Sequence, residues 1–240
     1  WTTPAIGPVG YVSPAIVKVD GEDHVVMISA SGGGRGRPVV PGKVAGIDPL
    51  SGDILWDYHW DCRIPAPSAF DAGEGRVLIS GAYRAGAAMI QVSKKSEGGY
   101  EVEELFKTIE FGSHTKPPIM YEDHFYIQYS TNERRDGLVC MSMDGQIKWK
   151  TKREPAFDKG SMILVEGLIL ATDGLKSLYL IEPDTSGFKP IASAEVLTSM
   201  AGDERMDERF PAQNWAPIAL AEGKLLIRDH SRLMCVKVAE

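Results

Sequence analysis

The sequence predicts an all-β protein, a β-propeller of four-stranded antiparallel blades. Three observations predict it: a repeat that occurs five times, four short apolar runs in most copies, and no segment with a helical hydrophobic period. Glycine and proline, 25 and 15 of the 240 residues, separate the runs as turn residues do. The period of the repeat, roughly 50 residues, is that of propeller blades, so we expect about five blades in this chain.

Each repeat begins with two strands. A small residue or a proline precedes a short apolar run, then an acidic or glycine turn, then a run rich in β-branched or aromatic residues, which is typical of a hairpin. The equivalent positions are Pro14, Pro67, Pro118, Ser161 and Pro217.

A third apolar run follows in every copy, and a fourth follows in four of them. The third runs are 43–48, 87–92, 137–143, 177–182 and 232–238, and the fourth runs are 53–60, 101–107, 146–152 and 190–196. Several runs are apolar on consecutive residues, as expected for strands that are buried on both faces. The repeats are therefore expected over 11–60, 61–110, 111–154, 155–200 and 211–240, with a charged insertion at 197–210.

The two ends of the chain differ from the repeat. The fifth copy has no fourth run, and the first ten residues, with two prolines and two glycines, make a poor closing strand. Propellers commonly close by having the other terminus supply the last strand. We therefore expect this chain to be the C-terminal portion of a larger propeller.

The segment GIDPLSGDILW at 46–56 is the sharpest local motif. Asp48 and Gly52 are expected to form a tight turn between the third and fourth strands, because an Asp side chain accepts backbone N–H bonds and glycine adopts positive φ. Trp56, near the end of the outer strand, is expected to pack flat against the next blade.

A shortened copy, MSMDGQIKW, places Asp144, Gly145 and Trp149 in the same roles. The motif resembles the tryptophan-docking repeat of quinoprotein (PQQ-like) β-propellers, A-x-D-x-x-T-G-x-x-x-W, with Gly46 in place of the Ala and Ser51 in place of the Thr. The resemblance implies a bacterial protein of about eight blades when complete, located in the periplasm or outside the cell. It does not decide the chemistry, because the repeat occurs in PQQ-dependent dehydrogenases, in a non-catalytic outer-membrane-assembly lipoprotein and in secreted proteins of undefined activity.

The residues of a quinone site are not recognisable. In such enzymes the resemblance implies a quinone between a Trp and a flat partner, commonly two adjacent cysteines, with a bound Ca²⁺, whereas Cys62, Cys140 and Cys235 are far apart in the sequence. The five histidines form no metal-binding pattern. No cofactor or metal is therefore expected, and a PQQ- and Ca²⁺-dependent alcohol or sugar dehydrogenase with part of its site outside this chain is kept as the alternative.

The charge and the hydropathy of the chain restrict the kinds of partner that are expected. The net charge is −7, with 33 acidic and 26 scattered basic residues, so nucleic acid is not an expected partner. The apolar runs are far shorter than the ~20 residues of a membrane-spanning helix, so no membrane span is expected. The glycine-rich segment 32–43 lacks the G-K-[ST] ending of a phosphate-binding loop and is expected to be an extended loop.

Nine residues are candidates for a binding site at the mouth of the central channel, where a concave surface lined by polar and aromatic groups is the default ligand site. From the loops that lead into first strands come Tyr11, Arg63, His114, Lys159, Asn214 and Trp215. From the loops between second and third strands come Arg84, Asp229 and His230. We expect a non-catalytic scaffold for a protein or glycan ligand and assign no catalytic residue.

A weaker alternative is sugar-lyase or hydrolase chemistry at the same mouth. It would use His114 as the base, with Tyr11 as the acid or Arg63 stabilising the developing charge.

Overall fold

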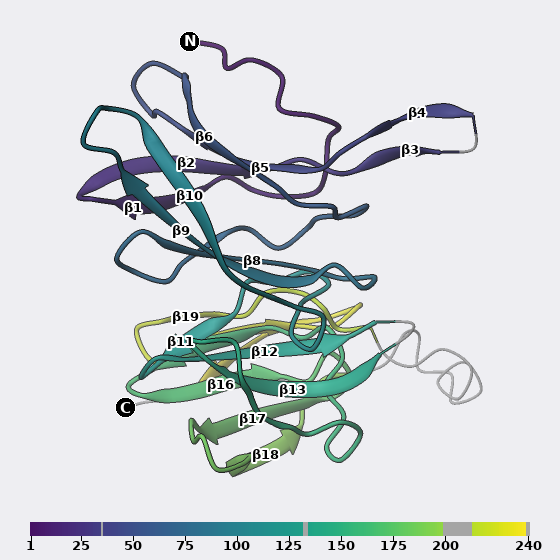
Figure 1. The fold of residues 1–240 in the computed structure, drawn as a ribbon. Coiled ribbons are helices and arrows are strands. Elements are labelled where there is room, and N and C mark those ends of the chain that lie inside the picture. Colours follow the sequence, from purple (N-terminus) through teal and green to yellow (C-terminus); the bar gives the residue numbers. More distant parts are fainter. Residues whose placement is uncertain (35, 132–133, 199–212, 239–240) are drawn as a thin grey trace. The chain divides into compact units, whose positions relative to one another are not determined.

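The structure, a computed structural model, describes residues 1–34, 36–131, 134–198 and 213–238, and these residues form strands and turns without a helix (Figure 1). Four antiparallel sheets have four strands, one has three, and a separate hairpin has two. A repeated four-stranded meander is the blade of a β-propeller, so the predicted fold class, all-β with about five blades, is confirmed. Most of the charged insertion predicted at 197–210 lies outside the described residues.

The described residues contain no helix that is long and apolar enough to cross a membrane. The chain divides into two compact units. Unit 1 comprises Trp1–Pro118 and Met143–Gln146, and unit 2 comprises Ile119–Ser142 and Ile147–Glu240.

Unit 1 contains two four-stranded sheets. The first has the order β1 (Ala15–Val19), β2 (Glu22–Ile28), β5 (Lys43–Ile47) and β6 (Ile54–His59), and the second has β7 (Phe70–Asp71), β8 (Arg76–Gly81), β9 (Gly86–Lys94) and β10 (Tyr100–Thr108). Five of the six residues of β8 are buried, as are six of the nine in β9, which explains why these segments are apolar on consecutive residues.

One expectation for unit 1 was wrong. The glycine-rich segment does not remain an extended loop, because β3 (Gly32–Gly34) and β4 (Arg37–Val40) pair as a short antiparallel hairpin that continues beyond the ends of β2 and β5 (Figure 1). Positive φ at Gly33 and Gly34 bends the first strand, which the sequence pattern does not reveal.

The Asp48–Gly52 turn of unit 1 has the geometry of a tight turn. The Gly52 N–H donates to the Asp48 carbonyl at 2.9 Å, the Leu50 N–H donates to the Asp48 side chain at 2.7 Å, and Gly52 has a φ of 81°. The indole of Trp1 lies against Gly52, and its N–H donates to the Pro49 carbonyl at 3.1 Å.

The Trp56 indole is buried and turns back over its own sheet. A Cβ built on Gly46 would lie 2.0 Å from Trp56 Cε2, so the ring occupies the space that a side chain would need. The indole N–H donates to His24 Nδ1 at 2.9 Å. Trp56 also belongs to the buried cluster that includes Val77 and Ile90 of the second sheet. Packing against the next blade was expected from the sequence, whereas the contact with Gly46 was not.

Because His24 accepts the hydrogen bond of the Trp56 indole, the stability of unit 1 is expected to depend on the protonation of His24. The ring is 1% exposed and meets Tyr100 edge-on at 4.7 Å, and Tyr100 in turn is bonded to Glu22. Because Nδ1 accepts the Trp56 N–H, a doubly protonated ring would have to give up that bond. Burial lowers the pKa of His24, against a smaller opposing effect of Glu22.

We expect unit 1 to lose stability as the pH falls through about 6.5, the unfolded pKa of histidine. Below that pH the unfolded chain binds a proton that the folded His24 does not, so folding is disfavoured by about 1.4 kcal/mol for each unit by which the pKa is lowered. Melting temperatures between pH 8 and pH 5 measure this slope, and His24→Gln should flatten it. Its control is the exposed His59→Gln, and equal slopes in both variants would contradict the role given to His24.

Unit 2 contains the other three sheets. Their strands are β11 (Ile119–Tyr121), β12 (His124–Ser130), β13 (Arg135–Ser142) and β14 (Ile147–Lys150); β15 (Met162–Val165), β16 (Leu168–Thr172), β17 (Ser177–Glu182) and β18 (Lys189–Glu195); and β19 (Ala219–Ala221), β20 (Lys224–Arg228) and β21 (Leu233–Lys237). In β12 six of seven residues are buried, whereas all seven residues of the edge strand β18 are exposed. A register shift between Leu180 and Ile181 accompanies Pro190 in β18.

The second docking motif is divided between the units. Asp144 and Gly145 belong to unit 1, where Gly145 has a φ of 85° and a Cβ on it would lie 2.8 Å from the Phe106 ring. Trp149 belongs to unit 2, where its indole N–H donates to the Asp184 carbonyl at 2.8 Å and its ring packs against Phe188. Trp1, Phe106 and Trp149 thus all lie against a turn between a third and a fourth strand.

Candidate functional site

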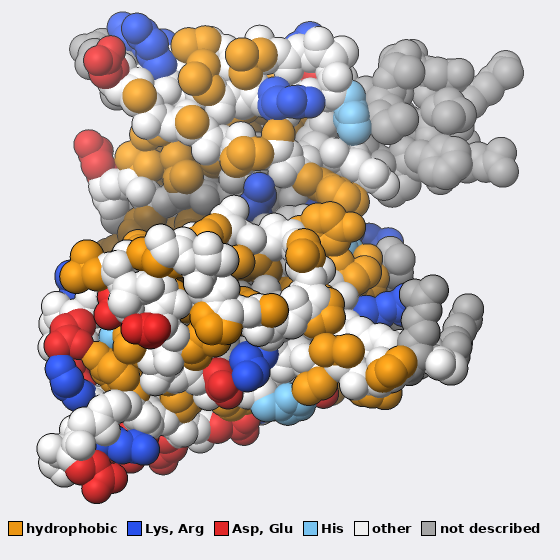
Figure 2. Space-filling model, turned by 90° about the horizontal axis from the view of Figure 1, so that it is seen from above, with side chains coloured by type: hydrophobic (Ala, Val, Ile, Leu, Met, Phe, Trp, Pro, Cys, Tyr) orange, Lys and Arg blue, Asp and Glu red, His pale blue; other side chains and the backbone are white. Residues whose placement is uncertain are grey.

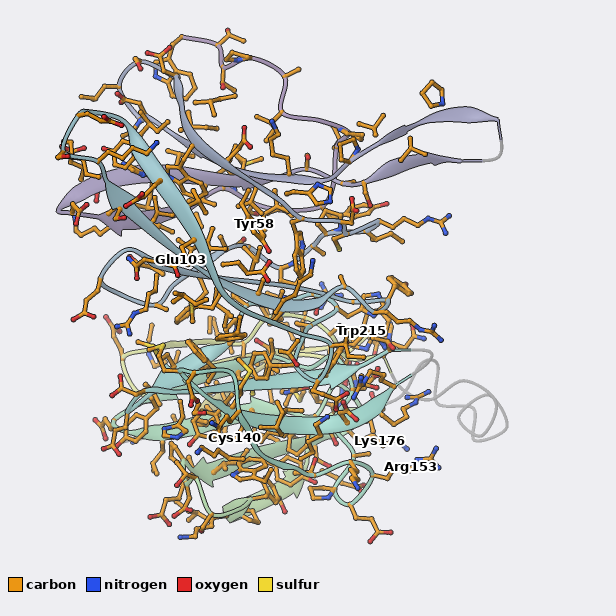
Figure 3. All side chains as sticks on the ribbon, viewed as in Figure 1. Tyr58, Glu103, Cys140, Arg153, Lys176 and Trp215 are labelled. Atoms are coloured by element: carbon orange, nitrogen blue, oxygen red, sulfur yellow. The ribbon has the colours of Figure 1, made fainter. Side chains whose placement is uncertain are left out.

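The loops at one end of the strands of unit 2 carry most of the polar residues of interest. Figure 3 shows Arg153, Lys176 and Trp215 at this end, whereas Cys140 lies well away from it. The three labelled residues come from three different connections, namely those between β14 and β15, between β16 and β17, and leading into β19. The sheet meander therefore brings together residues that are up to 62 positions apart, from 153 to 215.

Asp158, Lys159 and Trp215 form the centre of this loop region. Lys159 Nζ lies 2.9 Å from Asp158 Oδ1, and both residues are less than a tenth exposed. The Trp215 indole N–H donates to Asp158 Oδ2 at 3.1 Å, and Lys159 Nζ lies 4.5 Å from the centre of the Trp215 ring. A buried ion pair gains little net stability over apolar residues of similar volume, whereas removal of one partner alone leaves an uncompensated buried charge.

Backbone contacts hold this centre in place. Gln128 donates to the Thr172 carbonyl at 2.7 Å and accepts from the Gly160 N–H at 2.8 Å. A Cβ on Gly160 would lie 1.9 Å from the Thr172 oxygen, so only glycine allows the two chains to approach this closely. The Ser161 hydroxyl accepts from the Ile218 N–H at 3.2 Å, which joins the loop before β15 to the loop before β19.

A solvent-open pocket of roughly 200 Å³, open solvent included, lies beside Trp215. It contains four of the nine candidate residues, and its lining is Gln213, Asn214, Trp215, Ala216, Arg228, Asp229 and His230. Asn214 is 3% exposed and its side-chain amide donates to the carbonyls of Leu175 and Thr198. Its Oδ1 is buried and has no hydrogen-bond partner among the described residues.

Asp229 lies at this pocket, but its carboxylate already has many donors. It accepts from the Thr198 amide and hydroxyl at 3.1 and 2.8 Å, from the Ser231 N–H at 2.9 Å, and from the Arg232 guanidinium at 2.7 Å. Burial acts to raise the pKa of Asp229, but Arg232 and the hydroxyl and amide donors outweigh it and hold that pKa well below its usual range.

In the preceding sheet, Asp173 occupies the position equivalent to Asp229, and its contacts show what an aspartate does at this position. Its Oδ1 accepts from the backbone N–H groups of Leu175 and Ser177 at 2.7 and 3.0 Å, directly after β16. Here burial outweighs the amide donors and raises the pKa of the carboxyl group. Asp173 and Asp229 thus both hold the connection between a second and a third strand, and Asp229 does so with an additional arginine.

The remaining candidates lie in the loops of unit 1. Tyr11, Arg63 and Arg84 are exposed, and Arg84 has a φ of 69°. The backbone N–H of Tyr11 donates to the Pro65 carbonyl at 2.8 Å. His114 is half-buried, and its ring meets Tyr83 edge-on at 4.8 Å. The candidates therefore fall into two groups, with Lys159, Asn214, Trp215, Asp229 and His230 in unit 2.

The described residues do not fit the quinone site of the alternative function. The ammonium group of Lys159 covers the Trp215 ring, and the indole N–H is bonded to Asp158. Cys140 is a free, buried thiol in a central strand, where burial raises its pKa to about 11, and it is not adjacent to another cysteine. The described part of the chain has no cluster of three or more His, Cys, Asp or Glu residues that could hold a metal ion.

Several residues of this region were not predicted. Asp158 looks like a solvated loop charge in the sequence, and only the structure shows that Lys159, Trp215 and Arg135 converge on it, the last at 3.8 Å. The sequence signal for this centre was the pair Asp158 and Lys159, which lies shortly before the first strand of its sheet. On the face of the molecule that Figure 2 shows, basic and acidic side chains are interspersed.

Comparisons with known proteins support the fold alone. No family model matches the sequence, and no curated protein matches it. Sqt1 of Saccharomyces cerevisiae has a TM-score of 0.52 at 9% identity, over 90% of this chain and 77% of that one. BamB from Moraxella catarrhalis has a TM-score of 0.39 at 12% identity, over 88% of this chain and 66% of that one. Glutaminyl cyclase of Myxococcus xanthus has a TM-score of 0.37 at 12% identity, over 92% and 90%. The chain thus spans just under two thirds of the length of BamB.

Proposed function

We propose that this chain acts as a non-catalytic binding β-propeller of the PQQ-like repeat family, and that the loop face of its blades binds a protein or glycan ligand. The motif around Trp56 supports the family, and with it a bacterial protein that functions in the periplasm or outside the cell. In unit 2 the candidates for such a loop face are Lys159, Asn214, Trp215, Asp229 and His230, and in unit 1 they are Tyr11, Arg63, Arg84 and His114.

The buried Oδ1 of Asn214 is the observation that carries the proposal. A buried acceptor without a partner costs about 1–3 kcal/mol, and a ligand N–H or O–H would recover that cost. The two amide N–H bonds hold this side chain in place, and Trp215 lines the same pocket. Lys159 lies over one face of its ring, so a ligand would contact the remainder of the indole. A side chain that is already held by hydrogen bonds loses less entropy on binding.

Binding to a glycan array and to a displayed peptide library tests the proposal with the whole chain. We expect a reproducible ligand whose binding is lost in Trp215→Ala and reduced about tenfold in Asn214→Ala. Lys148→Ala, an exposed change on β14, is the control and should bind as the parent does. Ligands that bind both Trp215→Ala and the parent equally, or the absence of any ligand in both libraries, would overturn the proposal.

The dehydrogenase alternative has its own test. Addition of PQQ and Ca²⁺ with an artificial electron acceptor to the protein should give no turnover of alcohols or sugars. Reproducible turnover would replace the binding function by an enzymatic one.

A further inference from the structure

A second pocket in unit 2 shares no lining residue with the Trp215 pocket and is rich in basic residues, although its Arg135 lies 3.8 Å from Asp158, to which the Trp215 indole is bonded. It encloses about 1010 Å³, open solvent included, and its lining is Arg135, Thr151, Lys152, Arg153 and Glu154. Arg135 begins β13, and the other four residues follow β14 directly. Three of the five lining residues therefore carry a positive charge, in a chain whose net charge is −7.

The turn that forms this pocket is firmly held. The Thr151 and Lys152 N–H groups donate to the carbonyls of Leu138 and Asp136 at 2.9 and 2.8 Å, and Thr151 Oγ1 accepts from the Leu138 N–H at 3.0 Å. The Glu154 N–H donates to the Thr151 carbonyl at 3.2 Å. The basic side chains are thus mounted on an ordered backbone, which reduces the entropy lost when they bind a ligand.

Lys152 occupies a backbone conformation that few residues other than glycine adopt. Its φ is 59°, and Gly137 beside it has a φ of 72°, with no room for a Cβ between it and Thr151. A non-glycine residue at positive φ costs roughly 1–2 kcal/mol, and Lys152 is one of nine such residues among those that the structure describes. The charged side chains of this turn, and not its backbone conformation, indicate which class of ligand it would bind.

The basic side chains that line the pocket have fewer ion-pair partners than the basic side chains next to it. Arg134 and Lys150 lie 2.8 and 3.0 Å from Asp136, so each of them has an ion-pair partner in that carboxylate. Lys152 and Arg153 are exposed and have no carboxylate within ion-pair distance among the described residues. Within the described ranges, the carboxylate paired with Arg135 is the more distant Asp158, at 3.8 Å.

The lining also indicates which anion would fit. Arginine binds the planar oxygens of a carboxylate or a phosphate group with paired hydrogen bonds, and lysine adds a point charge. Glu154 would repel a densely charged polymer, but its carboxylate and the Thr151 hydroxyl can bond to the hydroxyl groups of a sugar. A ligand with one oxyanion and several hydroxyl groups satisfies all five residues.

We propose that this pocket binds an acidic sugar, with Arg135, Lys152 and Arg153 holding its carboxylate or phosphate group and Glu154 and Thr151 its hydroxyl groups. The pocket shares no lining residue with the Trp215 pocket. If the acidic-sugar proposal fails, the binding function proposed at Asn214 and Trp215 still stands. If that binding function fails, the acidic-sugar proposal still stands.

Titration of the ¹⁵N-labelled chain with D-glucuronate, glucose 6-phosphate and D-glucose tests this proposal. We expect the acidic sugars to shift the amide signals of 151–154, the neutral sugar to bind at least tenfold more weakly, and added NaCl to weaken the acidic sugars only. Glucuronate and glucose 6-phosphate separate a carboxylate ligand from a phosphate ligand, and tighter binding of either one supports the site.

Two variants with the same charge change provide the control. Arg153→Gln should weaken binding of the acidic sugars about tenfold, whereas Lys148→Gln on β14 should leave it unchanged. The melting temperature of each variant shows that it is folded, and Arg153→Lys, which keeps the charge, should recover part of the affinity. Equal binding of glucose and glucuronate, no effect of Arg153→Gln, or binding of poly-glutamate with no response to either acidic sugar would overturn the proposal.

Discussion

Replacement of Asp229 by leucine is expected to destabilise unit 2 by about 3 kcal/mol. Leucine fills a similar volume, but it leaves the Thr198 amide and hydroxyl, the Ser231 N–H and the Arg232 guanidinium without their acceptor. The Arg232 side chain is about half exposed, so its guanidinium can be hydrated when the carboxylate is gone. The expected loss of stability is therefore at the lower end of the range for a broken buried ion pair. Thermal unfolding followed by circular dichroism measures the change.

Asp229→Asn separates the charge from the hydrogen bonds. It keeps an acceptor for the loop but not the charge, so about 1–2 kcal/mol should be lost. Since the folded pKa of Asp229 is lowered, its contribution is present above about pH 4 and disappears as the pH falls further, and the asparagine variant should lack that part of the acid dependence. Identical acid profiles of parent and variant would contradict the ion pair with Arg232.

Gly46→Ala is expected to destabilise unit 1 by about 2 kcal/mol although it adds a single methyl group. The new Cβ would lie 2.0 Å from the Trp56 ring, so the indole must move and its bond to His24 must lengthen or break. A matched control is Gly187→Ala, where the added Cβ meets nothing within 4 Å and which should change the melting temperature little.

A double variant makes this prediction sharper. Trp56→Leu removes the ring and is itself destabilising, but alanine at position 46 should then cost much less than it does beside Trp56. Additive effects of the two substitutions would show that the ring and the glycine are not coupled. The Ala of the PQQ-like motif at this position makes the test informative, because Gly46 is the departure from the motif that admits the ring.

The fold class followed from the sequence because its signals are local. Apolar runs bounded by glycine, proline and acidic turns define strands within a few residues, and their recurrence defines the sheets. The 177–182 run, for example, is the strand β17. The hairpin at 32–40 was missed because a glycine-rich strand has no side-chain pattern to detect.

The site was only partly predictable because it depends on distances between loops. Asn214, Trp215, Asp229 and His230 could be placed at one end of the sheets from the strand order, and all four line one pocket. The burial of Asp158 could not be foreseen, since it results from three partners that lie elsewhere in the sequence. The basic pocket combines the start of β13 with the segment after β14, and neither part is conspicuous alone.

The exposed strand β18 has a consequence for how the protein behaves at high concentration. An unpaired sheet edge can recruit a strand from another molecule and begin to aggregate. In β18, Pro190 removes one N–H donor from that edge, Lys189 and Glu195 place a charge at each end, and the register shift opposite Pro190 interrupts the regular spacing. These features make β18 a poor template for intermolecular pairing, so its open edge is compatible with a chain that stays dispersed in a crowded compartment.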